Sequence, residues 1–234
     1  MTLFLHEVHR VRGLREDDFE AHYRDRWMPD LASGPHADDA RLLWYTHQAH
    51  GSGPAYRITT ITAVADGAAY ERLLDRVASG DLRSWARELD GLQHDSTGKV
   101  LLALPWSPLA SVDLAGVPVE PVDHELTLYM EDTGWPHAPL DDYTAFWGEV
   151  YAPMLARSSL LRIEACFQTA HGGGRRPEAT LLQKVISHEG LLKLFETETP
   201  SELKQPGTFM HDALQVRDQW ESRLLRTAAW SPLF

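Results

Sequence analysis

The sequence predicts an α+β fold in which two tandem β-α-β-β-α-β (ferredoxin-like) units form a pseudo-dimeric α/β barrel within one chain. The main observation is that the second half of the chain repeats the first. Residues 106–109 read Trp-Ser-Pro-Leu, and residues 230–233 read the same, 124 positions later. Residues 49–53 recur as residues 170–174 at a spacing of 121. A repeat of this length is a whole domain, not a solenoid module.

The repeat divides the chain into three parts. We place the first ferredoxin-like repeat at residues 1–109, a linker at 110–122 and the second repeat at 123–234. The linker holds Gly116 and two prolines and shows no periodicity. With 234 residues, of which 43% are hydrophobic, the chain is long enough to build two packed cores.

Within the first repeat, alternating β-branched and aromatic residues predict strands at 2–11, 41–48, 56–64 and 99–104. A helix is predicted from a cap at Asp17 or Asp18 to about residue 31. Its rings Phe19, Tyr23 and Trp27 are spaced i, i+4 and i+8 and therefore share one face. Two further helices are predicted after Asp66 and over 81–92.

The second repeat shows the same order. Strands are predicted at 126–132, 160–169, 179–186 and 222–229, and helices at 140–156, 189–196 and 209–220. A single ferredoxin-like unit leaves one sheet face bare, and an apolar sheet face must be buried. A tandem copy supplies that cover, which is why we expect a barrel.

Charge and composition exclude several classes of partner. The net charge of −12 disfavours binding to nucleic acid or to an anionic membrane. No apolar stretch is long enough for a transmembrane helix, and the first ten residues do not form a signal peptide. A single cysteine, Cys166, fits a reducing compartment, so we expect a cytoplasmic protein that is a monomer or a homodimer.

The helix ending in Arg26-Trp27-Met28-Pro29 and the later Tyr70…Arg83-Ser84-Trp85 stretch resemble the dimeric α/β barrel superfamily, and within it the NIPSNAP-like and antibiotic-biosynthesis monooxygenase-like branches. The resemblance covers nearly the whole chain, twice. The second repeat departs from it at Glu149-Val150-Tyr151. Superfamily membership implies that a small molecule binds between helices and sheet, in oxygenases, polyketide cyclases, haem-binding proteins or isomerases. The fold alone does not choose among these activities.

Residues that differ between the repeats point to a site in the first repeat, because both copies need the fold but one copy is enough for a site. Aligning the halves pairs Trp44, Tyr45 and His47 with Ala165, Cys166 and Gln168. The same alignment pairs His6 with Met130, His22 with Phe146 and Arg57 with Glu178. By contrast, His50 and His171 occupy equivalent turns, which favours a structural role for both. No histidine or carboxylate spacing predicts a metal site.

These residues suggest aromatic chemistry. We expect Phe19, Tyr23, Trp27, Trp44, Tyr45 and Trp85 to stack on a planar substrate, and His47, His22, His6 and Arg57 to supply a base and enolate stabilisation. The predicted function is an oxygenase of secondary metabolism acting on a hydrophobic polycyclic aromatic polyketide.

No flavin or nicotinamide fingerprint occurs in the sequence. We therefore expect no tightly bound cofactor, with dioxygen or a diffusible reduced flavin (FMN or FAD), supplied by a flavin reductase, as co-substrate. Two alternatives remain open: a polyketide cyclase or dehydratase, and a non-enzymatic protein that binds haem or another small ligand.

Overall fold

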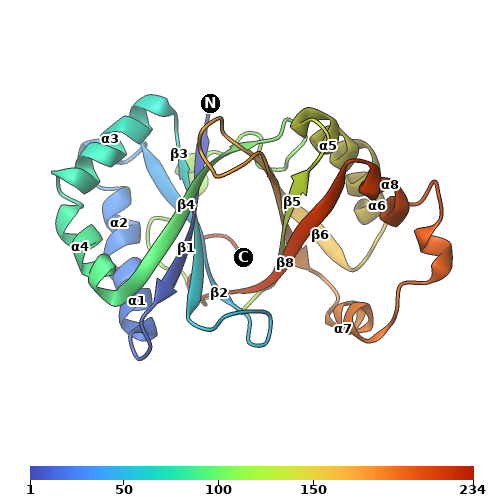
Figure 1. Cartoon of the computed structure of the whole chain (residues 1–234). Helices are drawn as coiled ribbons and strands as arrows, with labels where there is room; N and C mark the ends of the chain where they lie inside the picture. The colour runs from blue at the N-terminus through green and yellow to red at the C-terminus, as the bar shows by residue number, and fades with distance from the viewer. The chain divides into compact units, whose positions relative to one another are not determined.

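The computed structural model describes residues 1–234, and the chain divides into two compact units. Unit 1 contains residues 1–102, 111–127 and 225–234, and unit 2 contains residues 103–110 and 128–224. The elements follow the predicted order β-α-β-β-α-β twice, as the colours of Figure 1 show along the chain. The predicted α+β fold of two ferredoxin-like repeats is therefore confirmed.

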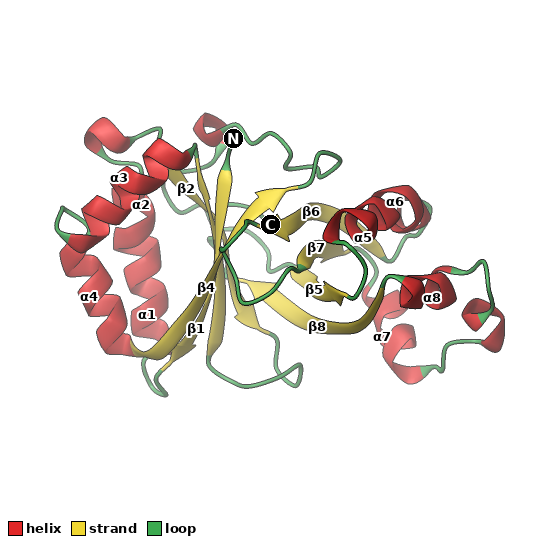
Figure 2. Cartoon of the chain, turned by 45° about the horizontal axis from the view of Figure 1, so that its top comes forward, coloured by secondary structure: helices red, strands yellow, loops and turns green.

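Unit 1 has a four-stranded antiparallel sheet with helices on one face (Figure 2). Its strands are β1 (Leu3–Val11), β2 (Ala40–Gln48), β3 (Arg57–Val64) and β4 (Gln93–Ala103, the last residue belonging to unit 2), in the order β4-β1-β3-β2. The helices are α1 (Glu16–His22), a π-helix (Tyr23–Trp27), α2 (Met28–Leu31), α3 (Gly67–Ala78) and α4 (Arg83–Leu92). Short 3-10 helices cover Gly34–His36 and Leu114–Gly116.

Unit 2 has strands in the order β8-β5-β7-β6. They are β5 (Leu128–Pro136), β6 (Leu161–Thr169), β7 (Ala179–Val185) and β8 (Arg217–Thr227, the last three residues belonging to unit 1). The helices are α5 (Leu140–Phe146), a π-helix (Trp147–Tyr151), α6 (Ala152–Ala156), α7 (His188–Glu196) and α8 (Phe209–Asp212). Two 3-10 helices, Ser201–Lys204 and Ala213–Gln215, flank α8.

Two local predictions were wrong. The helix predicted over 209–220 ends at Gln215, and Arg217 begins β8 instead. The reason is pairing: β5 extends to Pro136, and the next two amides, those of His137 and Ala138, donate to the carbonyl of Val216. The predicted cap at Asp17 or Asp18 is also wrong. Arg15 occupies the N-cap position without a capping side chain, and the acidic residues lie in the first turn, where they favour the helix dipole.

The register of the strands relates the two repeats residue by residue. Leu5 pairs with Thr62 in unit 1, and Met130 pairs with Gln183 in unit 2. Thr62 and Gln183 differ by the same 121 positions as the two hairpin turns, so Leu5 corresponds to Met130. The alignment of His6 with Met130 was therefore wrong by one residue, because β1 and β5 are offset by 125 positions. His6 corresponds to Glu131, and His9 corresponds to Gly134.

The repeated Trp-Ser-Pro-Leu segments belong to exchanged tails. Residues 103–110 (the first tail) end the first repeat but lie in unit 2, and residues 225–234 (the second tail) end the second repeat but lie in unit 1. In unit 2, Ser107 Oγ accepts a hydrogen bond from the amide of Cys166 at 2.9 Å, and the amide of Leu104 donates to the carbonyl of Cys166. Each tail therefore completes the unit formed by the opposite repeat.

Candidate functional site

The most distinctive polar group in unit 1 is a histidine buried between the helices and the sheet. His9 lies on β1 and is 4% exposed. Its Nδ1 is 2.9 Å from Gln93 Oε1, and its Nε2 is 3.2 Å from both Thr60 Oγ1 and the hydroxyl of Tyr23. The aromatic ring of Phe19 packs against His9 at 5.2 Å between centroids. Three strands and one helix thus hold a single imidazole.

The partners of His9 define its tautomer. Gln93 Nε2 donates to Asp90 Oδ1 at 3.1 Å, which orients the amide so that its oxygen faces His9. An amide oxygen only accepts, so Nδ1 of His9 carries the proton and Nε2 presents a lone pair. That lone pair can accept from the hydroxyl of Tyr23 or of Thr60. The arrangement therefore orients one basic nitrogen toward a phenol.

Burial adjusts the acidity of these groups. Desolvation is the main cause that lowers the pKa of His9, although the nearby charge of Glu7 and the Gln93 hydrogen bond oppose it. Desolvation likewise raises the pKa of Tyr23 well above its ordinary value. At neutral pH His9 is therefore uncharged and able to accept a proton, while Tyr23 stays protonated.

Aromatic rings surround His9 in the core of unit 1. Phe19 and Tyr23 lie 5.2 Å apart, Tyr23 and Trp27 6.0 Å apart, and Tyr23 and Tyr45 5.3 Å apart between ring centroids. The predicted ring stripe of the first helix is thus confirmed, and it points at the sheet. The buried hydroxyl of Tyr45 has no hydrogen-bond partner. An unpaired buried hydroxyl is costly, and it marks a place where a ligand oxygen could bind.

None of the four members of this network recurs in unit 2. Gly134 stands at the position of His9, and the positions of Gln93, Thr60 and Tyr23 hold Arg217, Leu181 and Trp147. A Cβ atom on Gly134 would lie 1.9 Å from the hydroxyl of Tyr143, so the phenol fills the space that His9 occupies in unit 1. The comparison between repeats therefore singles out His9, which was not among the site residues predicted from the sequence.

His47, the predicted base, has both ring nitrogens engaged. Nδ1 lies 3.1 Å from Glu16 Oε1, and Nε2 lies 2.8 Å from Glu20 Oε2. Burial lowers the pKa of His47, but the hydrogen bonds and charges of Glu20 and Glu16 outweigh burial and raise it overall. Two carboxylates favour an imidazolium, which holds α1 on β2 and has no lone pair to accept a substrate proton.

The other predicted residues lie apart from His47. His22 Nε2 donates to the carbonyl of Trp85 at 3.0 Å and packs against its indole, joining α1 to α4. Arg26 lies over the same indole at 5.1 Å. By strand alternation, His6, Trp44 and Arg57 lie on the sheet face opposite His9 and Tyr45. The structure therefore brings together only Phe19, Tyr23, Trp27 and Tyr45 of the predicted set around His9.

Unit 2 holds a different polar network, which the sequence did not suggest. Tyr151 donates to Gln183 Oε1 at 2.7 Å, and Gln183 Nε2 donates to Asp132 Oδ2 at 2.8 Å. The hydroxyl of Ser222 donates to the other oxygen of Asp132. Burial raises the pKa of the Asp132 carboxyl. Four residues on separate elements form this group, and no short motif links them.

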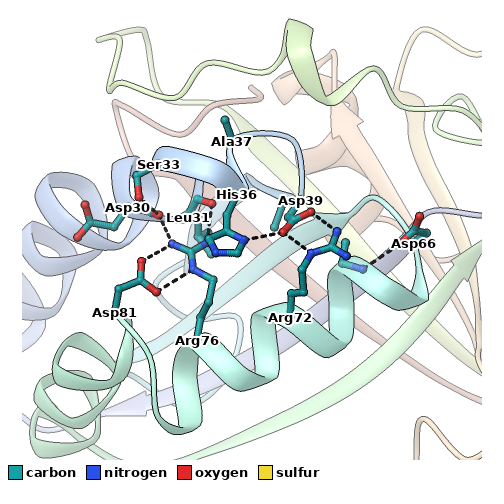
Figure 3. Close-up of polar contacts among 12 residues, drawn as sticks. Asp30, Leu31, Ser33, His36, Ala37, Asp39, Asp66, Arg72, Arg76 and Asp81 are labelled. Carbon is teal, nitrogen blue, oxygen red and sulfur yellow. Dashed lines mark hydrogen bonds and ion pairs between the residues drawn. The ribbon is translucent and has the colours of Figure 1, made fainter.

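A second cluster of charges in unit 1 is structural (Figure 3). Arg76 on α3 donates to the carbonyls of Asp30 and Leu31 at the end of α2 and to the carboxylate of Asp81. Arg72 and His36 both hold Asp39, and the Arg72 hydrogen bond is the main cause that lowers the pKa of Asp39 to about 2. The cluster ties the loop after α2 to α3 and satisfies helix-end carbonyls.

Two observations bear on metal and haem binding. No group of three or more His, Cys, Asp or Glu side chains is placed to hold a metal ion. A cavity in unit 2 is lined by Trp106, Pro108, Ala152, Leu155, Ala156, Ser158, Leu161, Arg162, Ile163 and Ile186. This lining contains none of the His, Cys, Met or Tyr side chains that bind haem iron, so it does not fit haem. No helix combines the length and the apolar character needed to cross a membrane.

Comparison with known proteins supports the fold. No protein-family model and no curated protein matches the sequence. The chain is similar to the structure of an anthrone oxidase-like protein, with 11% identity, a TM-score of 0.61 and coverage of 97% of this chain and 91% of that one. The chain is also similar to two candidate monooxygenases. The one from Lactobacillus acidophilus NCFM has 9% identity and a TM-score of 0.57, with coverage of 99% of this chain and 98% of that one. The one from Fusobacterium nucleatum has 5% identity and a TM-score of 0.58, with coverage of 97% of this chain and 92% of that one. These similarities agree with the predicted fold of two ferredoxin-like repeats.

Proposed function

We propose that this protein is an oxygenase that acts on a hydrophobic polycyclic aromatic molecule of the polyketide type, with His9 as the proton acceptor. The single observation that carries the proposal is the buried, uncharged His9 whose basic nitrogen faces Tyr23 inside a set of aromatic rings. The names of structurally similar proteins, two candidate monooxygenases and an anthrone oxidase-like protein, agree with this reaction class.

The chemistry needs only a base and dioxygen. His9, directly or through Tyr23, accepts the proton of an activated ring methylene or phenol, which leaves an electron-rich carbanion. With an anthrone-type ring, the carbanion adds dioxygen at the methylene carbon, and loss of water from the resulting hydroperoxide leaves a carbonyl. One oxygen atom enters the product and the other leaves as water, so no external reductant is required.

The surrounding residues supply orientation. The rings of Phe19, Tyr23 and Tyr45 can stack on a planar substrate and exclude water from the reacting carbon. The unpaired hydroxyl of Tyr45 can donate to the substrate oxygen that gains charge as the proton leaves. Trp27 and Trp85 are only partly buried and pack against this core. We propose that the substrate enters when these two side chains move aside. A reduced flavin delivered by a reductase remains our proposed co-substrate for less reactive rings.

Anthrone oxidation tests the proposal directly. Anthraquinone formation and oxygen uptake are followed for the wild type, His9→Gln, Tyr23→Phe and, as a matched histidine control, His47→Gln. We expect a loss of about 100-fold or more for His9→Gln, a smaller loss for Tyr23→Phe and no change in rate for His47→Gln. Circular dichroism checks that each variant is folded.

The pH dependence gives a second readout. Because the pKa of His9 is lowered, the rate should hold its plateau below pH 6.5 before it falls. An unchanged rate in a folded His9→Gln variant would exclude His9 as the base. Turnover of a polyketide substrate without oxygen, still dependent on His9, would instead identify a cyclase or dehydratase.

A further inference from the structure

Unit 2 contains a cavity, several of whose lining residues differ from their counterparts in unit 1. It has a volume of ≈ 400 Å³ and lies where the end of α6, the start of β6, the end of β7 and the first tail meet. This volume is in the range of pockets that hold small organic ligands. Apolar side chains supply most of its lining, with Ser158 and Arg162 as the polar members.

Two differences between the repeats account for the cavity. Ala152 stands where unit 1 has Met28, which is 2% exposed and fills the corresponding space. The loop after α6 (157–160) is also four residues shorter than the loop after α2 (32–39), which carries the 3-10 helix Gly34–His36. A smaller side chain and a shorter loop leave volume unfilled, which a packed core normally avoids.

The side-chain contacts that hold the loop after α2 in unit 1 are also missing from unit 2. In unit 1, Arg72 and His36 hold Asp39, which closes the loop against α3 (Figure 3). Lys193 stands in place of Arg72 and pairs with Glu189 on its own helix, and Leu160 stands in place of Asp39. The cavity therefore coincides with several sequence differences between the repeats and not with a single packing defect.

The cavity walls point to a neutral aromatic ligand. The indole of Trp106 forms one wall, and Gly148 gives it room, since a Cβ atom there would lie 2.8 Å from the indole nitrogen. Arg162 is paired with Glu164 at 2.6 Å, so the pair brings no net charge to the cavity. The chain as a whole carries −12, which disfavours an anionic ligand further.

Ser158 offers polar recognition at the cavity. Its Oγ accepts a hydrogen bond from the amide of Leu160, which leaves the hydroxyl proton to donate.

We propose that this cavity is a second ligand site, separate from the His9 site, for a neutral molecule with two linked or fused aromatic rings. The side chains that surround the ligand are those of Trp106, Leu155 and Ile163, with Ser158 as hydrogen-bond donor. The site does not depend on the oxygenase proposal, because none of its lining residues lies in unit 1.

Binding of N-phenyl-1-naphthylamine, an uncharged two-ring probe that fluoresces in apolar surroundings, tests the site. We expect saturable binding of one probe per chain in the micromolar range and a rise in Tm with probe concentration. Ala152→Met, which installs the first-repeat residue, should weaken binding at least tenfold without lowering Tm. Val150→Met, which places the same methionine side chain at an exposed position two residues away, should bind as the wild type does.

A second blocking variant covers the case in which Ala152→Met fails to fold. Ala156→Trp places a large ring at an exposed position of the cavity rim and should also weaken binding tenfold. His9→Gln should keep the full affinity, which separates this site from the oxygenase site. The absence of saturable binding, or equal affinity of the wild type and a folded blocking variant, would overturn the proposal.

Discussion

Ser231 Oγ accepts a hydrogen bond from the backbone amide of Tyr45 at 3.1 Å, although the two residues are 186 positions apart. The amide of Ala228 donates to the carbonyl of Tyr45 at 3.0 Å, so the second tail satisfies both backbone groups of that residue. Ser107 and Leu104 do the same for Cys166 in unit 2. The repeated Trp-Ser-Pro-Leu segment is thus explained by two equivalent docking positions.

The second tail should contribute strongly to the stability of unit 1. Trp230 is 2% exposed, and its indole N–H donates to Glu20 at 2.8 Å. We expect Trp230→Ala to lower the free energy of unfolding by about 3–5 kcal/mol. Ser231→Ala should cost about 1–3 kcal/mol, because it leaves the buried amide of Tyr45 unpaired. Urea unfolding measures both, with the half-exposed Phe234→Ala as a control that should change little.

The stabilisation from the contacts of His47 with Glu16 and Glu20 should depend on pH in a characteristic way. Its raised pKa means that its contribution is complete below the ordinary histidine value of 6.5 and is lost as pH rises through the folded-state value. The lowered pKa of Glu20 means that the carboxylate contribution is lost below about pH 4.5. We expect the difference in Tm between wild type and His47→Gln to be largest between these pH values. Glutamine is the matched replacement, since Gln168 occupies this position in the second repeat. A Tm difference between wild type and His47→Gln that stays constant up to pH 9 would contradict an ionic contribution from His47.

Two buried tyrosines should respond oppositely to loss of the hydroxyl. Tyr23→Phe removes a hydrogen bond to His9 and should destabilise the protein by about 1 kcal/mol. Tyr45→Phe removes a buried hydroxyl without a partner and should be neutral or stabilising by up to about 1 kcal/mol. Denaturant midpoints measured side by side decide this, and equal destabilisation by both changes would show that Tyr45 does have a partner.

Asp39 should contribute to acid sensitivity. Its pKa of about 2, below the ordinary 3.8, means that its stabilising contribution is present above pH 4 and is lost as pH falls toward 2. Because Arg72 is half exposed, solvent screening reduces the size of this effect. We expect Asp39→Asn to flatten the acid limb of the Tm profile and to lower Tm at neutral pH. An unaltered acid limb would show that the interaction with Arg72 and His36 adds nothing.

Gly134 should resist any larger residue. A methyl group there would overlap the hydroxyl of Tyr143, so Gly134→Ala should cost about 1–3 kcal/mol. In a Tyr143→Phe background the same change should cost less, which a double-mutant cycle from urea unfolding would measure. An equal cost in both backgrounds would mean that the backbone, not the phenol, sets the requirement for glycine.

Much of the fold was predictable because it depends on local patterns. The run of β-branched residues in β3, the cap at Asp66 and the ring spacing of Phe19 and Tyr23 are all readable along the chain, and the structure agrees with each. The π-helices were not predicted, since both interrupt an otherwise regular helical pattern. The end of the helix at Gln215 depended on pairing with a distant strand.

The site was harder to predict than the fold. His9 depends on Gln93 and Thr60, which are 84 and 51 residues away, and no local pattern joins them. The comparison between repeats contained the signal, because all four network residues change in the second copy, but many other residues also differ between the copies. The contacts of His47 with Glu16 and Glu20 could not be predicted either. Strand alternation predicts which sheet face a side chain lies on, but it does not predict which helix residues the side chain meets.

The exchanged tails constrain how this protein can fold during synthesis. A ribosome releases the N-terminal repeat first, and N-terminal domains usually fold before the rest of a chain has been made. Here the sheet of unit 1 lacks its last partner, and the core lacks Trp230, until residues 225–234 have been made. The N-terminal repeat therefore cannot complete its core before the second repeat has been synthesised.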